Sequence, residues 1–155
     1  MSKAAHRRAS IAMSEDEVRA FLRERQVMTV ATIAVDGRPH LTAMWYGFME
    51  DGTPALWTYG KSQKVVNVRR DPRITCLIED GEAYNELRGV ELRAIATVIE
   101  ERQAVDALGL SVYERYTGPI DDGAHEVVRV MGAKRVAVRI EVERTVSWDH
   151  RKQAL

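Results

Sequence analysis

The first clear pattern along the chain is that of a short amphipathic helix. The segment SEDEVRAFLRER begins with Ser14 and Glu17 at the spacing of a capping box. Its apolar residues Val18, Phe21 and Leu22 fall on one face of the expected helix. We therefore predict a short helix that packs against the core through this face.

Beyond this helix the pattern changes to extended segments separated by turn signals. Apolar and β-branched residues fill residues 27–35, 38–49 and 54–59, and an Asp-Gly pair lies in each of the two connections. Asp-Gly between apolar runs is among the strongest short-range signals for a β-hairpin. We predict that the three segments form a meander of antiparallel strands.

The first two of these strands lack a polar face. Apolar side chains occupy both alternating sets of positions in residues 27–35 and in residues 38–49. A sheet that is apolar on both faces must be covered on both, and the chain offers few helices to do so. We therefore expect a homodimer whose interface buries the outer face of the sheet.

The middle of the chain alternates between short helices and strands. A helix over residues 61–70 should end at Asp71, because the residue before Pro72 disfavours helical geometry. Apolar periodicity also predicts strands over residues 73–80 and 88–100 and helices over residues 101–116 and 124–131.

The segment 135–149 is a last alternating strand. Its alternation places Val136, Val138, Ile140 and Val142 toward the interior. The order of the elements predicts a mainly β protein, with six or seven antiparallel strands in a barrel and small helices packed at its ends.

Length and composition indicate one globular domain. The chain has 155 residues, of which 45% are hydrophobic, and this is enough to bury a core of ordinary size. Residues 1–13 are basic and show no periodicity. We expect a flexible N-terminal tail over residues 1–13, followed by a single domain over residues 14–155.

Charge, hydropathy and cysteine content indicate which kinds of partner the protein binds and in which compartment of the cell it lies. Basic and acidic residues balance at 23 each, so no general field attracts nucleic acid or an anionic membrane. No stretch approaches the roughly 18 uninterrupted apolar residues of a membrane-spanning helix, and the chain does not begin like a signal peptide. The single cysteine, Cys76, lies in an apolar run and is interpreted as a small buried hydrophobe. We expect a cytoplasmic protein.

Few residues carry chemistry of their own. His6, His40, His125 and His150 are scattered, and none is paired with a second ligand at the spacing of a metal site. The sequence contains no Gly-x-Ser-x-Gly segment, no glycine-rich dinucleotide motif and no Walker-type loop. If the protein is an enzyme, we expect its reactivity to come from a cofactor and its substrate to be a small molecule.

The strongest local feature is a basic segment at the start of the helix over residues 61–70. Residues 61–73 contain one acid, Asp71, against five basic residues, which are Lys61, Lys64, Arg69, Arg70 and Arg73. A helical wheel places Lys61 beside Val65 and Val68, on the side expected to be buried. A lysine in the first turn of a helix opposes the helix dipole, which favours negative charge there.

Two interpretations of this segment remain open. Free backbone N–H groups, the hydroxyl of Ser62 and the ammonium groups of Lys61 and Lys64 would together form a phosphate site. The alternative is a solvated charge run on a surface helix, which is the commoner meaning of such a pattern.

At this point the sequence resembles a known family. The segments TVATIAVDGRPHLTAMWYGF, WTYGKSQKVVNVRRDPRITCLIED and RGVELRAIATV, with a terminal VSWD, are similar to the pyridoxamine 5′-phosphate oxidase-like split β-barrel flavoproteins. Within them the chain is most similar to the flavin/deazaflavin oxidoreductases that use coenzyme F(420). The resemblance extends over residues 14–149, and it implies an FMN-binding type of split barrel that forms a homodimer with two cofactor sites at the interface.

The resemblance also implies site residues. Lys61, Ser62 and Lys64 match residues that hold the cofactor phosphate. Trp148 matches a tryptophan that approaches the site from the other protomer, and a packed strand end is the alternative for it. The residues that match the lining of the cofactor ring are Thr42, Ala43, Met44, Trp45, Trp57, Thr58 and Tyr59, with Arg38 and Asn67 as weaker matches.

The implied function is hydride transfer from reduced coenzyme F(420) to an electron-poor conjugated acceptor, such as an enone, a quinone or a tetrapyrrole. The chain lacks the fuller C-terminal region of true pyridoxamine phosphate oxidases, which argues against oxidation of that vitamin. An FMN-dependent oxidoreductase and a binding protein without turnover remain alternatives. No catalytic residue is assigned, because Tyr46, Tyr59 and His40 could supply a proton only if they face the site, and solvent could serve instead.

Overall fold

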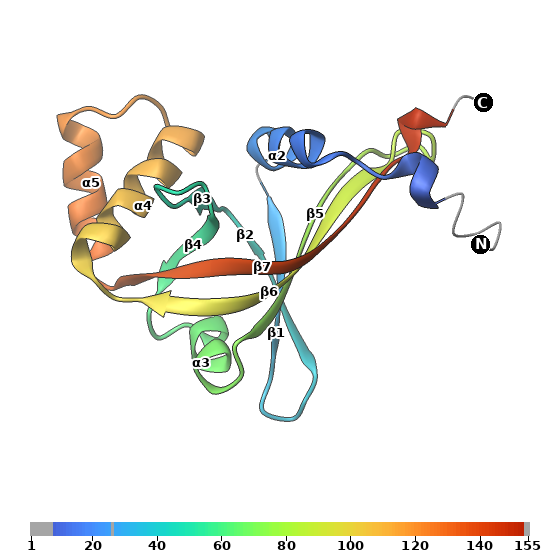
Figure 1. The fold of residues 1–155 in the computed structure, drawn as a ribbon. Coiled ribbons are helices and arrows are strands. Elements are labelled where there is room, and N and C mark those ends of the chain that lie inside the picture. Colours follow the sequence, from blue (N-terminus) through green and yellow to red (C-terminus); the bar gives the residue numbers. More distant parts are fainter. Residues whose placement is uncertain (1–7, 26, 154–155) are drawn as a thin grey trace.

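Seven antiparallel strands of the described chain form one curled sheet (Figure 1). The computed structural model describes residues 8–25 and 27–153. Neighbouring strands follow the order β2-β1-β5-β6-β7-β4-β3. The strands are β1 (Met28–Ile33), β2 (Pro39–Met44), β3 (Gly47–Phe48), β4 (Pro54–Tyr59), β5 (Arg73–Asp80), β6 (Arg88–Ile99) and β7 (Arg135–Asp149). The helices are α2 (Glu15–Glu24), α3 (Gln63–Arg70), α4 (Arg102–Tyr116), α5 (Asp122–Gly132) and the short 3-10 turn η1 (His150–Lys152).

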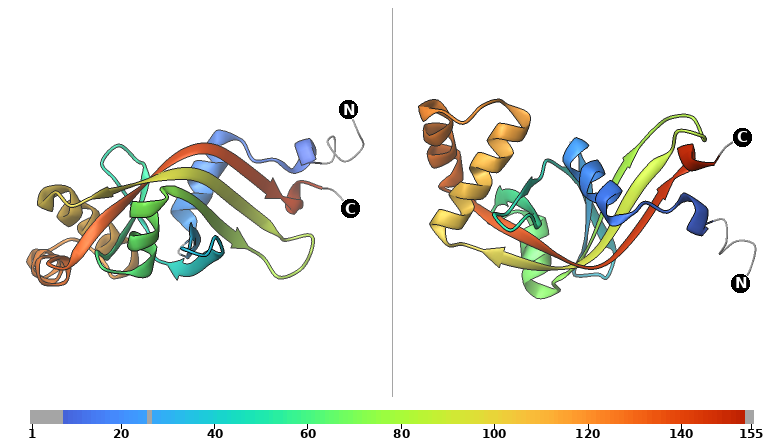
Figure 2. Two further views of the ribbon diagram at one scale, coloured as in Figure 1. Left: turned by 90° about the horizontal axis from the view of Figure 1, so that it is seen from below. Right: turned by 45° about the horizontal axis from the view of Figure 1, so that its top comes forward.

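The mainly β prediction is confirmed, and the sheet is a split barrel. Strands β6 and β7 are 12 and 15 residues long and pair along almost their whole length. Their curvature carries the sheet from the α4–α5 hairpin at one end to both chain termini at the other (Figures 1 and 2). The two ends of the molecule therefore differ in what surrounds the sheet.

The predicted three-stranded meander is wrong in its middle strand. Residues 38–49 do not form one strand; they divide at Trp45 and Tyr46 into β2, which pairs with β1, and β3, which pairs with β4. Strands β2 and β3 consequently lie at opposite edges of the sheet order.

Tyr46 provides the physical reason for the break. Its side chain is fully buried, and its hydroxyl donates to the carbonyl oxygens of Leu22 and Arg25 at the end of α2. Its backbone N–H donates to the hydroxyl of Tyr116 in α4 rather than to a neighbouring strand. These long-range contacts replace the ladder that local alternation predicts.

Helix α2 forms as predicted. The Ser14 hydroxyl accepts from the Glu17 N–H at 3.2 Å, and the Glu17 carboxylate accepts from the Ser14 N–H at 2.6 Å, so the capping box is complete. Phe21 and Leu22 are buried in the core, and Val18 packs against it. The predicted amphipathic face is confirmed.

The end of β7 departs from the predicted alternation. Val136, Val138 and Ile140 are buried, but Val142 is 41% exposed. Val142 still pairs in register with Ala94, and the register shift that follows it leaves Glu143 as an extra residue on β7. Residues 141–145 are all exposed, so in the single chain neither face of this part of β7 is covered. The prediction that Val142 faces inward is therefore wrong.

The interior divides into two apolar clusters. The larger cluster joins α2 and α3 to β1, β4, β5, β6 and β7, and it contains Leu56 of β4. The smaller lies between β4, β7 and the α4–α5 hairpin and contains Trp57, Leu108 and Val128. Because successive residues of a strand face opposite sides, β4 separates the two clusters.

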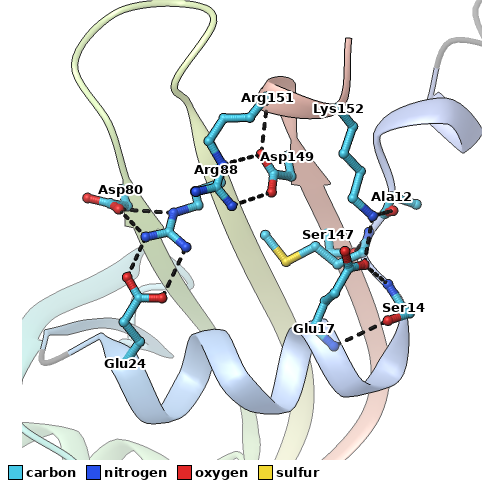
Figure 3. Close-up of polar contacts among 11 residues, drawn as sticks. Ala12, Ser14, Glu17, Glu24, Asp80, Arg88, Ser147, Asp149, Arg151 and Lys152 are labelled. Atoms are coloured by element: carbon cyan, nitrogen blue, oxygen red, sulfur yellow. Dashed lines mark hydrogen bonds and ion pairs between the residues drawn. The ribbon is translucent and has the colours of Figure 1, made fainter. Parts of the chain in front are cut away.

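The chain ends are held together beside β7 (Figure 3). The Met13 N–H donates to the Ser147 hydroxyl at 3.0 Å, and Lys152 donates to the Ala12 carbonyl and pairs with Glu17. Residues 8–11 are helical. Residues 1–7 lie outside the described residues, so the flexible tail and the single domain over residues 14–155 stay predictions.

The outer side of β2 remains open in the single chain. Leu41 and Trp45 are 63% and 56% exposed, and Ala43 between them is exposed as well. This is the two-sided apolar surface that the sequence predicts, while the homodimer itself stays a prediction. No helix among the described residues is long and apolar enough to cross a membrane. Cys76 is buried, and burial raises the pKa of its thiol to about 12, as expected for an inert side chain.

Candidate functional site

A basic cavity lies where β4 ends and α3 begins. Its volume is about 1020 Å³. Five basic side chains and one acidic side chain line it, so the cavity is strongly positive in a chain without net charge. The lining residues are Tyr59, Gly60, Lys61, Ser62, Arg69, Glu100, Arg102, Ala133, Lys134, Arg135 and Val136. We call this space the basic cavity.

Several cations of the basic cavity lack an acidic partner. Arg69 pairs with Glu100, and Arg102 pairs with Asp106. The other three basic residues of the lining make no ion pair with any residue of the described chain; they are Lys61, Lys134 and Arg135. Unpaired positive charge facing a cavity favours an anionic ligand.

Ser62 adds an unused hydroxyl to this charge. It is the N-cap of α3 and has extended backbone angles, yet its side chain makes no capping hydrogen bond. Its Oγ atom is buried and has no hydrogen-bond partner among the described residues. The N–H groups of the first turn of α3 have no partners within the helix. Together these donors are arranged for an anion at the start of α3.

Lys64 lies in the first turn of α3, two residues after Ser62, and lines neither cavity. It is 9% exposed, and its ammonium donates to the Thr58 hydroxyl at 3.1 Å. Burial lowers the pKa of Lys64 from the ordinary lysine value, and the charge of Arg135 lowers it further. The prediction that Lys61 lies on the buried side is wrong: Lys61 precedes α3 and is exposed.

A second cavity of about 420 Å³ lies beneath the α4–α5 hairpin. We call it the apolar cavity, because most of the side chains around it are aliphatic or aromatic. It is lined by Met44, Trp45, Trp57, Val112, Tyr113, Thr117, Val127, Val128, Met131 and Arg135.

Arg135 lines both cavities. Its guanidinium lies over the rings of Trp57 and Tyr59, at 4.4 and 4.6 Å from their centroids, and donates to the Trp57 carbonyl at 2.9 Å. The pairing of β4 with β7 places Arg135 directly opposite Tyr59. Sequence reasoning missed this residue, because only the pairing of two strands far apart in the chain brings it to the site.

The predicted ring-lining residues divide between several environments. Met44, Trp45 and Trp57 line the apolar cavity, and Trp45 stacks on Tyr116 with the ring centroids 4.4 Å apart. Tyr59 lines the basic cavity.

Three more of the predicted ring-lining residues line neither cavity. Thr58 lies on the side of β4 opposite to Trp57 and Tyr59, where its hydroxyl accepts from Lys64. Ala43 is exposed on β2. The buried Thr42 hydroxyl has no hydrogen-bond partner in the described chain.

Three further predicted residues lie apart from the cavities in the single chain. Arg38 is exposed in the turn between β1 and β2, beside Asp36. The Asn67 amide is fully buried and donates to the Thr32 hydroxyl. Trp148 lines a separate cavity of about 470 Å³ near the chain ends. Its contribution to a site in another protomer stays a prediction.

The candidate proton donors also separate. Tyr46 is bonded to carbonyl oxygens in the core, and burial raises its pKa to about 12. His40 lies on β2, with Nδ1 buried and without a partner in the described chain. Tyr59 is 55% exposed and is the one of the three that lines the basic cavity.

Comparison with known families shows to which family the chain belongs. The sequence profile described as pyridoxamine 5′-phosphate oxidase matches residues 14–149. The chain belongs to this family. The pyridoxamine 5′-phosphate oxidase match extends from the capping box of α2 to the last residue of β7 and includes the strands and helices around both cavities.

Several members and structural neighbours can be named. The chain is 27% identical over 132 residues to the F420H(2)-dependent biliverdin reductase of Mycobacterium tuberculosis (strain CDC 1551 / Oshkosh), covering 84% of this chain and 85% of that one. The crystal structure of the conserved hypothetical protein Rv2991 from Mycobacterium tuberculosis is 52% identical, with a TM-score of 0.90, over 94% of this chain and 90% of that one. A solved F420 reductase is 23% identical with a TM-score of 0.64, over 87% and 96% of the two chains, and shares the fold.

Proposed function

We propose that the chain is a coenzyme F(420)-dependent reductase that delivers a hydride to an electron-poor conjugated acceptor. The observation that carries the proposal is the junction, at Arg135, of a basic cavity to an apolar cavity lined by Trp45 and Trp57. The Ser62 hydroxyl in the basic cavity has no hydrogen-bond partner in the described chain. A relative named as an F420H(2)-dependent biliverdin reductase supports the same class of reaction.

The residues of the basic cavity fit a phosphorylated cofactor. Lys61, Ser62 and Lys64 would hold its phosphate, because the ammonium groups and the unused Ser62 donor lie at the start of α3. Met44, Trp45 and Trp57 would lie against its ring. When bound, reduced coenzyme F(420) supplies a hydride from carbon 5 of its deazaflavin ring.

The surplus of positive charge favours coenzyme F(420) over FMN. FMN carries one phosphate, for which Lys61, Ser62 and Lys64 suffice. Coenzyme F(420) carries carboxylates beyond its phosphate, and the basic cavity offers further cations in Lys134 and Arg135 without acidic partners in the described chain. The carboxylates of coenzyme F(420) would pair with these further cations, whereas FMN has no group that would.

The protein's own contribution would be binding, orientation and the exclusion of water. The aromatic and aliphatic walls of the apolar cavity would keep the acceptor dry and flat. Tyr46 is committed to carbonyl oxygens in the core and has a raised pKa, so it supplies no proton to the product. We propose that solvent supplies this proton through the open side of the basic cavity, beside Tyr59.

We also propose that the working unit is a homodimer. The exposed apolar side of β2 needs a cover, and Trp148 lies far from both cavities of its own chain. A partner chain would satisfy both features by covering Leu41 and Trp45 and bringing its own Trp148 region to the site.

A pair of titrations on one preparation tests the proposal. We expect coenzyme F(420) to bind more tightly than FMN, measured by the change in cofactor fluorescence. We also expect the reduced cofactor to be oxidised when enones, quinones or a tetrapyrrole are added, measured by the return of its absorbance. A tightly held FMN without affinity for coenzyme F(420) would replace the proposal with an FMN-dependent oxidoreductase. Tight binding without oxidation by any acceptor would replace it with a binding protein.

A further inference from the structure

The first turn of α3 begins without a side-chain cap. The Ser62 hydroxyl stands at the N-cap position but makes no capping hydrogen bond, and it has no partner among the described residues. A helix start without a cap is less stable, because its first N–H groups have no partners within the helix. Contacts other than the Ser62 hydroxyl therefore hold this turn against the sheet.

A series of side-chain hydrogen bonds joins this turn to strand β1. Gln63 is the first residue of α3, and its Nε2 donates to Oδ1 of Asn67 at 2.9 Å. Asn67 in turn donates from Nδ2 to the Thr32 hydroxyl on β1 at 3.0 Å. The spacing of four residues places Gln63 and Asn67 on one face of α3, one turn apart. We call these three residues the α3 tether.

The inner part of the α3 tether is completely enclosed. Asn67 is 0% exposed and Thr32 is 1% exposed, so water does not compete for the hydrogen bond between them. A buried side-chain amide is costly unless its polar atoms have partners, and the oxygen and the nitrogen of Asn67 each have one. Rotation of the Asn67 side chain would break both hydrogen bonds at once. The α3 tether therefore fixes the start of α3 relative to β1.

We propose that Asn67 is a positioning residue for the anion site at the start of α3. Through Gln63 it holds the first turn to β1, which leaves the Ser62 hydroxyl and the first backbone N–H groups available to the ligand. This inference rests on the proposed function, which places the cofactor phosphate at this point.

The positioning role differs from the contact with the cofactor ring that the family resemblance implies for Asn67. Asn67 and Thr32 are buried, and neither lines the basic cavity or the apolar cavity. A ligand in either cavity therefore senses these two residues only through the position of α3.

Thr32 offers a matched pair of variants at the end of the tether that is remote from the site. Thr32→Ser keeps the hydroxyl that accepts from Asn67 and loses a methyl group. Thr32→Val keeps the shape of the side chain and loses the hydroxyl. If the position served packing alone, the serine variant would be the more damaging of the two. If it serves positioning, the valine variant is the more damaging for the ligand.

Gln63 offers a second variant at the exposed end of the tether. Gln63→Ala removes the link between the first turn of α3 and Asn67. Gln103→Ala is the control, because Gln103 is an exposed residue in the first turn of α4 that lines neither cavity.

The experiment measures two quantities on the full chain. The first, by NMR on the cofactor-free protein, is the hydrogen-exchange rate of the Val66 N–H, which donates to the Ser62 carbonyl in the first turn of α3. The second is the affinity for coenzyme F(420), by fluorescence titration.

We expect faster Val66 exchange and an affinity lower by about threefold to tenfold in Thr32→Val and in Gln63→Ala, because a loosened turn must be ordered again on binding. Thr32→Ser and Gln103→Ala should change either quantity by less than about twofold, since the α3 tether stays intact in both.

Two results would overturn the inference while coenzyme F(420) still binds the unchanged protein. An affinity that falls as far in Thr32→Ser as in Thr32→Val would make the position one of packing alone. An unchanged Val66 exchange rate in Gln63→Ala and Thr32→Val would show that the tether does not hold the first turn. In either case the positioning role is wrong and the reductase remains. If coenzyme F(420) does not bind the unchanged protein, the proposed function fails and the positioning role falls with it.

Discussion

Lys64 is a buried lysine at the start of α3, two residues after Ser62 of the basic cavity, although it does not line that cavity. A buried ammonium needs several acceptors, and Lys64 donates to one, the Thr58 hydroxyl, among the described residues. Helix α3 begins one residue before it, with an unpartnered Ser62 hydroxyl. An anion bound at this point would satisfy Ser62 and Lys64 together, so the cost of burying Lys64 is offset in the complex.

The first prediction concerns the two lysines of this site. Changing Lys61→Ala together with Lys64→Ala should weaken coenzyme F(420) binding by a few kcal/mol while the fold persists, because charge-assisted contacts contribute about 1.5 to 3 kcal/mol each. Fluorescence titration measures the affinity and circular dichroism the fold. Arg129→Ala is the control, since Arg129 is exposed and paired with Glu126 outside both cavities. Unchanged affinity in the double variant would remove the phosphate assignment.

The second prediction is a pH dependence that belongs to Lys64. Burial and Arg135 lower its pKa below the ordinary lysine value of 10.5, so it loses its proton at a lower pH than an exposed lysine. Coenzyme F(420) affinity should fall as pH rises through this lowered pKa, because the phosphate loses a charged partner. In the cofactor-free protein the unfolding free energy should rise over the same window, since the unfolded chain binds the extra proton there.

Lys64→Arg provides the comparison for this pH dependence, because an arginine keeps its charge. Its affinity should change less between neutral and alkaline pH than that of the unchanged protein. Denaturant titrations of the cofactor-free unchanged protein at the same pH values measure the expected rise in its unfolding free energy. Parallel pH profiles for the two proteins would show that Lys64 is not the titrating group.

At the scale of elements, the sequence predicted correctly those features that depend on residues close together in the chain. The capping box of α2, the end of α3 at Asp71 and the alternation of β6 all follow from neighbouring residues. The break at Tyr46 and the exposed Val142 do not. The first depends on contacts with α2 and α4, and the second on the absence, in the described chain, of any element that covers residues 141–145 of β7. These features require knowledge of partners distant in the sequence.

The third prediction tests the packing of the α4–α5 hairpin on β4. Gly109 lies in α4 so close to Val128 and Trp57 that a Cβ atom would be 2.7 and 2.9 Å from them. Gly109→Ala should therefore destabilise the protein by about 1 to 3 kcal/mol through overpacking, although alanine is the better helix former by about 1 kcal/mol. Urea unfolding measures the change.

Gly123→Ala in α5 is the matched control for this test. Its Cβ atom would meet only the Asp121 carboxylate, at 3.2 Å, so the gain in helix propensity should not be cancelled. We expect this variant to be as stable as the unchanged protein or more so. Equal or greater stability of Gly109→Ala would show that the hairpin yields to the added methyl group and does not hold Trp57 rigidly.

At the scale of the whole molecule, the candidate site could be predicted only in part. Lys61, Ser62 and Lys64 adjoin in sequence, and their segment was recognisable from its charge and position. Arg135 reaches the same cavity only through the pairing of β7 with β4, 76 residues away from the position of Tyr59 in the chain. Trp148 lies at the other end of the same strand, so one long element spans both ends of the molecule.

The last prediction is that the chain dimerises through the open side of β2. Leu41 and Trp45 are 63% and 56% exposed on a surface that is apolar on its outer side, and a stable interface needs about 800 Å² from each partner. Leu41→Arg should shift the mass in sedimentation at micromolar concentration from twice the 17.5 kDa chain mass toward one chain, because a charge buried in such an interface costs several kcal/mol. Val130→Arg, on the exposed side of α5, should leave the dimer intact. Sedimentation of the unchanged protein as a monomer would refute the dimer and, with it, the contribution of Trp148 to a partner's site.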